Sequence, residues 1–179
     1  MPLLAAGQAR DALEGLSGRR LNGRWTVVEL VKQNRFQTGS CFSIGYKVKD
    51  DAGTVAFAKV LDFSRALQEP DSADALNRMT EAYLFERELL KICSGLNLTK
   101  VIKGLDYGEI EVDNVPLRKI YFIISEIAEC DVRKYMAENG PGYLSWRLAI
   151  LHDVATGLSQ LHKRGVYHQD LNGFILEGD

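Results

Sequence analysis

The chain has few of the features that would assign it at once to a specialised class of protein. It contains no apolar run of membrane-spanning length, and its three cysteines, Cys41, Cys93 and Cys130, are not spaced as metal ligands. With 22 basic and 24 acidic residues, the net charge of −2 offers no basic excess for nucleic acid or an anionic membrane surface. The start of the chain lacks the basic segment and apolar core of a signal peptide. We therefore expect a cytoplasmic protein with reduced thiols.

What the chain does have is the composition of a globular protein. Apolar residues make up 46% of its 179 residues and charged residues 26%, enough for a packed core in one domain or two small lobes. Residues 1–22 are interpreted as an N-terminal extension with a short helix that Gly18 stops. From Trp25 the periodicity predicts strands at 25–31, 44–49, 54–61, 101–110 and 118–125, and helices at 72–93, 131–138 and 145–162.

The end of the last predicted helix is the most informative stretch. The helix closes on Leu161-His162, a Gly165-Val166-Tyr167 turn follows, and then comes His168-Gln169-Asp170-Leu171. This arrangement resembles the approach to the catalytic loop of a eukaryotic-type protein kinase. The resemblance implies that His168 is a structural histidine. It also implies that Asp170 orients the substrate hydroxyl and takes its proton.

A lysine and a glutamate extend the resemblance to the first half of the chain. Ala56-Phe57-Ala58-Lys59 in the third predicted strand is similar to the kinase Val-Ala-Ile-Lys pattern, whose lysine contacts the α- and β-phosphates of ATP. In the helix that follows, Glu86 precedes a Leu-Leu pair as in the family's third helix. The resemblance implies an ion pair between Lys59 and Glu86, whereas Glu88 faces elsewhere. Two solvated surface glutamates remain the alternative.

The segment from Ile120 to Ala128 resembles the fifth kinase strand and the hinge that connects the two lobes. By this resemblance Ser125 is a small gatekeeper beside the nucleotide. The carbonyl of Glu126 and the amide of Ala128 bind the adenine edge, and Asp131 reaches the ribose.

The expected phosphate loop departs from the family pattern. Kinases have Gly-x-Gly-x-x-Gly-x-Val here, because glycines let backbone N–H groups approach phosphates closely. This chain places hydroxyl residues at the glycine positions and a glycine at the valine position. The loop residues expected to meet the nucleotide are Thr38, Gly39, Ser40, Phe42 and Gly45.

A second departure compensates the first. Phe57 stands where the family has a small residue, on the strand face that covers the adenine, and Gly45 stands where it has a valine. Such a large-for-small exchange answered by a small-for-large one conserves volume, and packed sites tolerate it. The alternative, that Phe57 fills the nucleotide pocket, stays open.

Gln169 replaces the arginine that usually receives an activation-loop phosphate. Past Leu171 the similarity ends, and Ile175 stands at the position of the metal-binding asparagine. No Asp-Phe-Gly occurs in the chain. By the resemblance ATP is the expected cofactor. Mg²⁺, which the intact family also binds, has no assigned ligand in this sequence.

The resemblance implies an α+β protein. A kinase-like small lobe at 23–127, with a five-stranded antiparallel sheet and one helix, precedes an incomplete large lobe at 128–179. The family transfers the ATP γ-phosphoryl group to Ser, Thr or Tyr hydroxyls of a protein substrate. Two alternatives remain: a non-catalytic pseudokinase or interaction module with a protein partner, and a small-molecule phosphotransferase of kinase-like fold. We also expect self-association through the incomplete large lobe.

Overall fold

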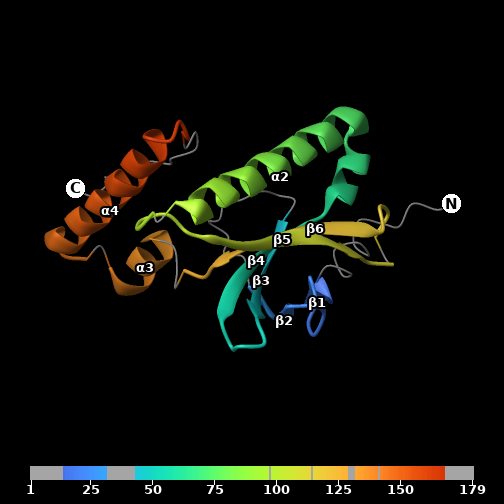
Figure 1. Ribbon diagram of the computed structural model, residues 1–179, viewed down its shortest axis with the longest axis horizontal. Coiled ribbons are helices and arrows are strands. Elements are labelled where there is room, and N and C mark those ends of the chain that lie inside the picture. Colours follow the sequence, from blue (N-terminus) through green and yellow to red (C-terminus); the bar gives the residue numbers. More distant parts are fainter. Residues whose placement is uncertain are drawn as a thin grey trace. The chain divides into compact units, whose positions relative to one another are not determined.

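The computed structural model describes residues 14–31, 43–96, 98–113, 115–128, 132–140 and 142–167. The chain is an α+β protein in which six strands form one sheet and one long helix lies against a face of it (Figure 1). The elements in chain order are β1 (Arg20–Leu21), β2 (Trp25–Val31), β3 (Ser43–Lys49), β4 (Val55–Leu61), η1 (Phe63–Gln68), α2 (Ser72–Gly95), β5 (Gly104–Glu111), β6 (Lys119–Glu126), α3 (Val132–Asn139) and α4 (Leu144–His162).

The sheet is antiparallel throughout, with the strand order β1-β2-β3-β4-β6-β5. The prediction of five strands is wrong by one, because Arg20 and Leu21 pair with the start of β2. Two residues are too short to show a strand periodicity, so only the tight turn at Asn22 and Gly23, both with positive φ, marks this hairpin. A turn with Gly53 at φ 91° joins β3 to β4.

The two faces of the sheet contribute to two separate cores. One face packs with Leu16 and Leu21, two residues that the sequence interpretation placed in the extension. This larger core also contains Trp25, Val27, Tyr46, Val48, Ala56, Ala58, Val60, Val112, Val115, Ile120, Phe122 and Ile124. The other face packs against η1 and α2 through Leu61, Phe63, Tyr83 and Ile123. Because side chains alternate along a strand, each of β4 and β6 supplies both cores.

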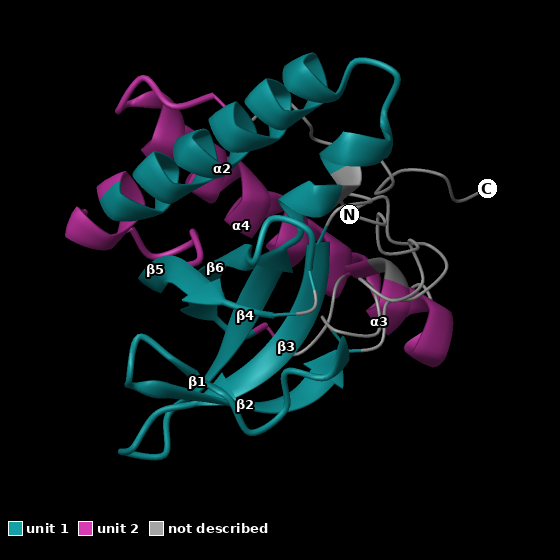
Figure 2. Cartoon of the chain, turned by 90° about the vertical axis from the view of Figure 1, so that its right-hand side faces the viewer, with its two compact units in different colours: residues 1–91, 103–127 teal, residues 92–102, 128–179 magenta. Residues whose placement is uncertain are grey.

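The chain divides into two compact units, coloured separately in Figure 2. The first comprises residues 1–91 and 103–127, and the second comprises residues 92–102 and 128–179. Within the second unit, Lys100 Nζ lies 2.7 Å from Asp153 Oδ2 on α4. The Tyr135 and Trp146 rings stack there with their centroids 4.7 Å apart. No helix in the described part of the chain combines the length and apolar character needed to span a membrane.

Candidate functional site

Alternation along β4 separates its core residues from its candidate functional residues. Ala56, Ala58 and Val60 are fully buried in the larger core. Phe57 and Lys59 therefore point to the opposite face, the one against which α2 packs. In the neighbouring strand β6, Ile123 lies opposite Lys59 and is 2% exposed, so Lys59 stands beside an apolar patch.

Lys59 and Glu86 form the ion pair that the sequence predicts. The Lys59 Nζ lies 2.7 Å from Glu86 Oε2, joining the centre of the sheet to α2. The two side chains are 28% and 34% exposed, so water screens the pair only in part. The pair holds the ammonium between the sheet and α2, where it can also contact an anion bound on this face.

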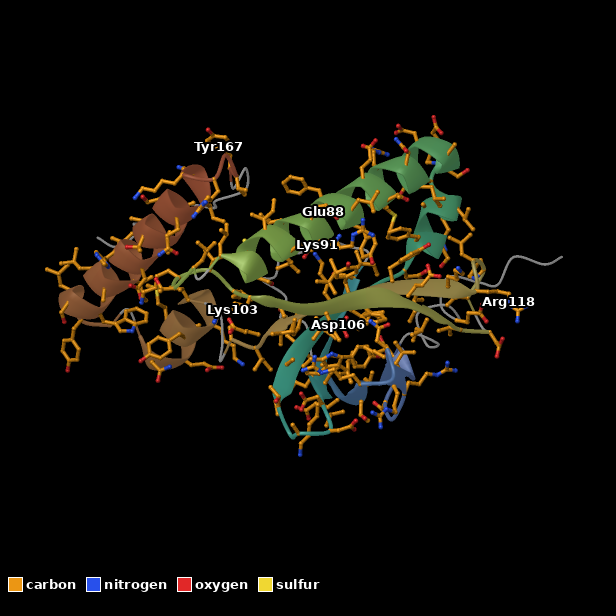
Figure 3. All side chains as sticks on the ribbon, in the orientation of Figure 1. Glu88, Lys91, Lys103, Asp106, Arg118 and Tyr167 are labelled. Carbon is orange, nitrogen blue, oxygen red and sulfur yellow. The ribbon has the colours of Figure 1, made fainter. Side chains whose placement is uncertain are left out.

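Glu88 faces away from Lys59, as predicted, and belongs to a separate group of charges. Its Oε1 accepts hydrogen bonds from Lys91 Nζ at 2.7 Å and from Arg87 at 3.3 Å (Glu88 and Lys91 are labelled in Figure 3). The hydrogen bond from Lys91 holds the pKa of the Glu88 carboxyl below its usual value. Glu86 and Glu88 thus have different partners, and of these two only Glu86 pairs with a residue of the central strand.

The Phe57 ring on β4 fills the space that a larger side chain at Gly45 on β3 would need. A Cβ added to Gly45 would stand 2.7 Å from Cε2 and 2.8 Å from Cζ of the Phe57 ring. Gly45 is buried, and Phe57 keeps intermediate exposure. The ring therefore lies over the glycine, and the Phe57 side chain stays partly exposed. An aromatic ring placed in this way can stack with a planar ligand.

The expected gatekeeper and hinge follow on β6. Ser125 lies opposite Phe57 in the sheet register, and its hydroxyl donates to the Glu126 carbonyl at 3.2 Å. The Glu126 carboxylate accepts from the Lys103 backbone N–H at 3.1 Å, and the Glu126 N–H donates to the Lys103 carbonyl at 3.0 Å. These bonds fix the end of β6, whereas Ala128 is exposed.

Several predicted site residues lie outside the described residues: Thr38, Gly39, Ser40 and Phe42 of the phosphate loop, Asp131, and Asp170 with its neighbour His168. The described residues that the fold does bring to one region are Gly45, Phe57, Lys59, Glu86, Ser125 and Glu126. Within the part of the chain that the structure describes, no cluster of three or more His, Cys, Asp or Glu side chains could hold a metal ion.

The sequence interpretation missed an aromatic group beside the middle of α2. Phe63 of η1, Tyr83 of α2 and Tyr121 of β6 pack together, with the Phe63 and Tyr121 rings stacked at 4.8 Å. A signal was available, because Thr80, Tyr83, Leu84 and Arg87 follow the i, i+3, i+4, i+7 spacing of one helix face. That spacing gave no indication that two strands would close a pocket beside it.

No protein family model matches the chain, and no curated protein matches it either. The geometry on the α2 face therefore carries the functional argument. It combines a cation held by a carboxylate, a partly exposed aromatic side chain and the end of β6. These are groups that can hold a phosphate, a planar base and a base edge.

Proposed function

We propose that the chain forms the nucleotide-binding part of a protein kinase-like domain and binds ATP on the α2 face of its sheet. The observation that supports this most strongly is the 2.7 Å ion pair between Lys59 on the central strand and Glu86 on α2. Kinases bind the ATP phosphates with a similar arrangement, in which a carboxylate on a helix orients a lysine on a strand.

Each group has a defined task in this proposal. Lys59 binds phosphate oxygens, and Glu86 keeps its ammonium pointed at them. The open surface of the Phe57 ring covers the base, and the Glu126 carbonyl and Ala128 amide bind the base edge. In the intact kinase family, bound ATP supplies a phosphoryl group for transfer to a protein hydroxyl, and the aspartate that Asp170 resembles positions that hydroxyl. Because this sequence has no Asp-Phe-Gly and has Ile175 at the position of the metal-binding asparagine, we propose nucleotide binding without efficient transfer for this chain.

Nucleotide binding by matched lysine variants tests the proposal. Lys59→Met removes the phosphate-binding charge. Lys119→Met is the control, because Lys119 on β6 also pairs with a glutamate, Glu109 on the neighbouring strand β5, at 2.6 Å. Lys119 lies four residues before Ile123, the residue of β6 opposite Lys59. Titration calorimetry with ATP is expected to give binding weakened about tenfold or more for Lys59→Met and unchanged for Lys119→Met. Equal affinity in both variants contradicts the proposal, provided that circular dichroism shows both to be folded.

The helix α2 provides a second matched pair. Glu86→Gln leaves Lys59 without its orienting carboxylate, while Glu88→Gln disturbs only the contacts with Lys91 and Arg87. ATP affinity is expected to fall in Glu86→Gln alone. A loss of the same size in Glu88→Gln would point to a general effect of helix charge.

A non-catalytic interaction module is the second candidate, and a different observation favours it. Tyr143, Leu144 and Leu148, at and near the start of α4, are 85%, 65% and 55% exposed. An apolar group of this kind is typical of a surface that contacts another protein. Light scattering of Leu144→Glu/Leu148→Glu beside the unaltered chain tests this candidate. If the unaltered chain is monomeric and transfers radiolabelled γ-phosphate in an Asp170-dependent way, the interaction module is excluded.

A further inference from the structure

A second candidate binding site lies in the first unit, beside the aromatic group described above. A pocket of 350 Å³ opens between η1, α2, β5 and β6. Neither Lys59 nor Glu86 lines it, so it is separate from the proposed nucleotide site. The lining residues that matter for its chemistry are Phe63, Tyr83, Leu84, Arg87, Tyr107 and Tyr121.

Four of the nine residues that line the pocket are aromatic: Phe63, Tyr83, Tyr107 and Tyr121. The Tyr83 and Tyr121 rings have centroids 5.2 Å apart, and the edge of Phe63 meets Tyr83 at 6.2 Å. These contacts fix the three rings against one another, so the wall is formed before a ligand arrives. A preformed aromatic wall favours a flat apolar ligand, because little conformational entropy is lost when such a ligand binds.

Arg87 gives the pocket its one incompletely bonded cation. Its guanidinium lies 5.9 Å from the centre of the Tyr83 ring and 5.4 Å from that of Tyr107. Its Nη2 reaches Glu88 only at 3.3 Å, and the same carboxylate oxygen is held more closely by Lys91 at 2.7 Å. The Arg87 Nε is buried and has no hydrogen-bond partner among the described residues. The side chain as a whole keeps 28% of its surface exposed, so its positive charge can attract a carboxylate bound beside it.

Glu109 is the carboxylate of the pocket lining, and it does not pair with Arg87. It is held by Lys119, with Oε1 and Nζ 2.6 Å apart. The pocket therefore presents an aromatic wall and one guanidinium with bonding capacity to spare. Its volume is at the lower end of the range of about 300–1,000 Å³ that is usual for small-molecule sites.

We propose that this pocket binds a small aromatic carboxylate, with its ring against Tyr83 and Tyr121 and its carboxylate on Arg87. A one- or two-ring acid matches the volume, the flat wall and the single cation. A neutral ligand of the same shape offers the guanidinium no additional negative charge, so charge is expected to decide between the two.

Titration calorimetry of the full chain with indole-3-acetate and with its neutral amide, indole-3-acetamide, tests the proposal. The acid is expected to bind at least about tenfold more tightly than the amide. Arg87→Gln should remove this preference. Arg78→Gln, which removes an arginine of the same helix that pairs with Asp74 and is 68% exposed, should keep it. Leu84→Trp narrows the pocket without touching the charge and should weaken both ligands.

Two results overturn the proposal. One is equal affinity for the acid and the amide in the unaltered chain, which includes the absence of binding by either up to millimolar concentration. The other is an acid preference that survives in a folded Arg87→Gln protein. A blocked dipeptide, acetyl-Phe-Asp-amide, distinguishes the source of the same chemistry. Binding of this peptide without binding of indole-3-acetate would contradict a small-molecule site.

Discussion

The ring of Phe57 lies so close over Gly45 on the neighbouring strand that a Cβ at position 45 would stand 2.7 Å from its Cε2 atom. The two residues are therefore coupled: the glycine provides the space that the large side chain uses. This relationship decides how much of the α2 face near Lys59 remains open for a ligand. It also leads directly to a test of the packing.

A double-mutant cycle measures this coupling. Gly45→Val forces the Phe57 ring to move, whereas in a Phe57→Ala background the same valine enters vacated space. We expect the valine to be less favourable beside Phe57 by about 1 kcal/mol in the free energy of unfolding. Chemical denaturation of the four proteins gives this value. Additive effects of the two substitutions would show that the ring does not depend on the glycine.

ATP is expected to stabilise the chain weakly and with little help from Mg²⁺. The chain carries no Asp-Phe-Gly, and hydroxyl residues replace the usual glycines of the phosphate loop. A ligand at about ten times its Kd raises the free energy of unfolding by roughly 1.4 kcal/mol, so weak binding still gives a measurable thermal shift. The comparison is ATP with and without Mg²⁺, with Lys59→Met as the control. A large Mg²⁺-dependent rise would reveal a metal site that the sequence interpretation lacks.

Two helical glycines are expected to respond to alanine in opposite directions. A Cβ at Gly157 of α4 would stand 2.7 Å from the Lys100 carbonyl oxygen, while a Cβ at Gly95, the last residue of α2, meets nothing within 4 Å. Gly157→Ala should push α4 away from the Lys100 segment, at a cost of about 1–3 kcal/mol. Gly95→Ala should be neutral or stabilising by up to about 1 kcal/mol. Thermal denaturation compares them, and a stabilised Gly157→Ala protein contradicts the close approach.

Burial raises the pKa of the Tyr83 hydroxyl above its ordinary value of 10.0. The folded state then holds the proton of Tyr83 more tightly than the unfolded state does. The resulting stabilisation is complete below pH 10 and is lost as the pH rises through the raised pKa. Tyr83→Phe should therefore lose stability less steeply than the unaltered chain at alkaline pH, measured by urea denaturation from neutral pH upward. Parallel pH profiles would mean that Tyr83 ionises as freely in the folded chain as in the unfolded one.

The local elements of the fold were predictable because their signals are local. Alternation in 25–31 and 54–61 predicted β2 and β4 to within a residue. The long helix 145–162 was placed to within one residue at its start. Each of these signals needs only a few neighbouring residues, and side-chain direction along a strand follows from them.

The Lys59–Glu86 pair was predictable only in part. The resemblance to kinases indicated it, and the packing of α2 against the sheet brings the two charged groups to 2.7 Å. The strand periodicity alone directs Lys59 to the face opposite Ala58, but nothing in the residues near Lys59 specifies which helix covers that face. Residues far along the chain specify it, through the packing of Tyr83 against Leu61 and Ile123.

Tertiary structure alone decided the remaining features. Arg20–Leu21 becomes a strand because its backbone pairs with β2. This pairing also brings the preceding Leu16 against the larger core, where it is buried. The pocket at Arg87 exists because η1, β5 and β6 converge on one face of α2. Short segments have too little intrinsic preference to fix their own conformation, so the free energy of burial against distant partners determines where they lie.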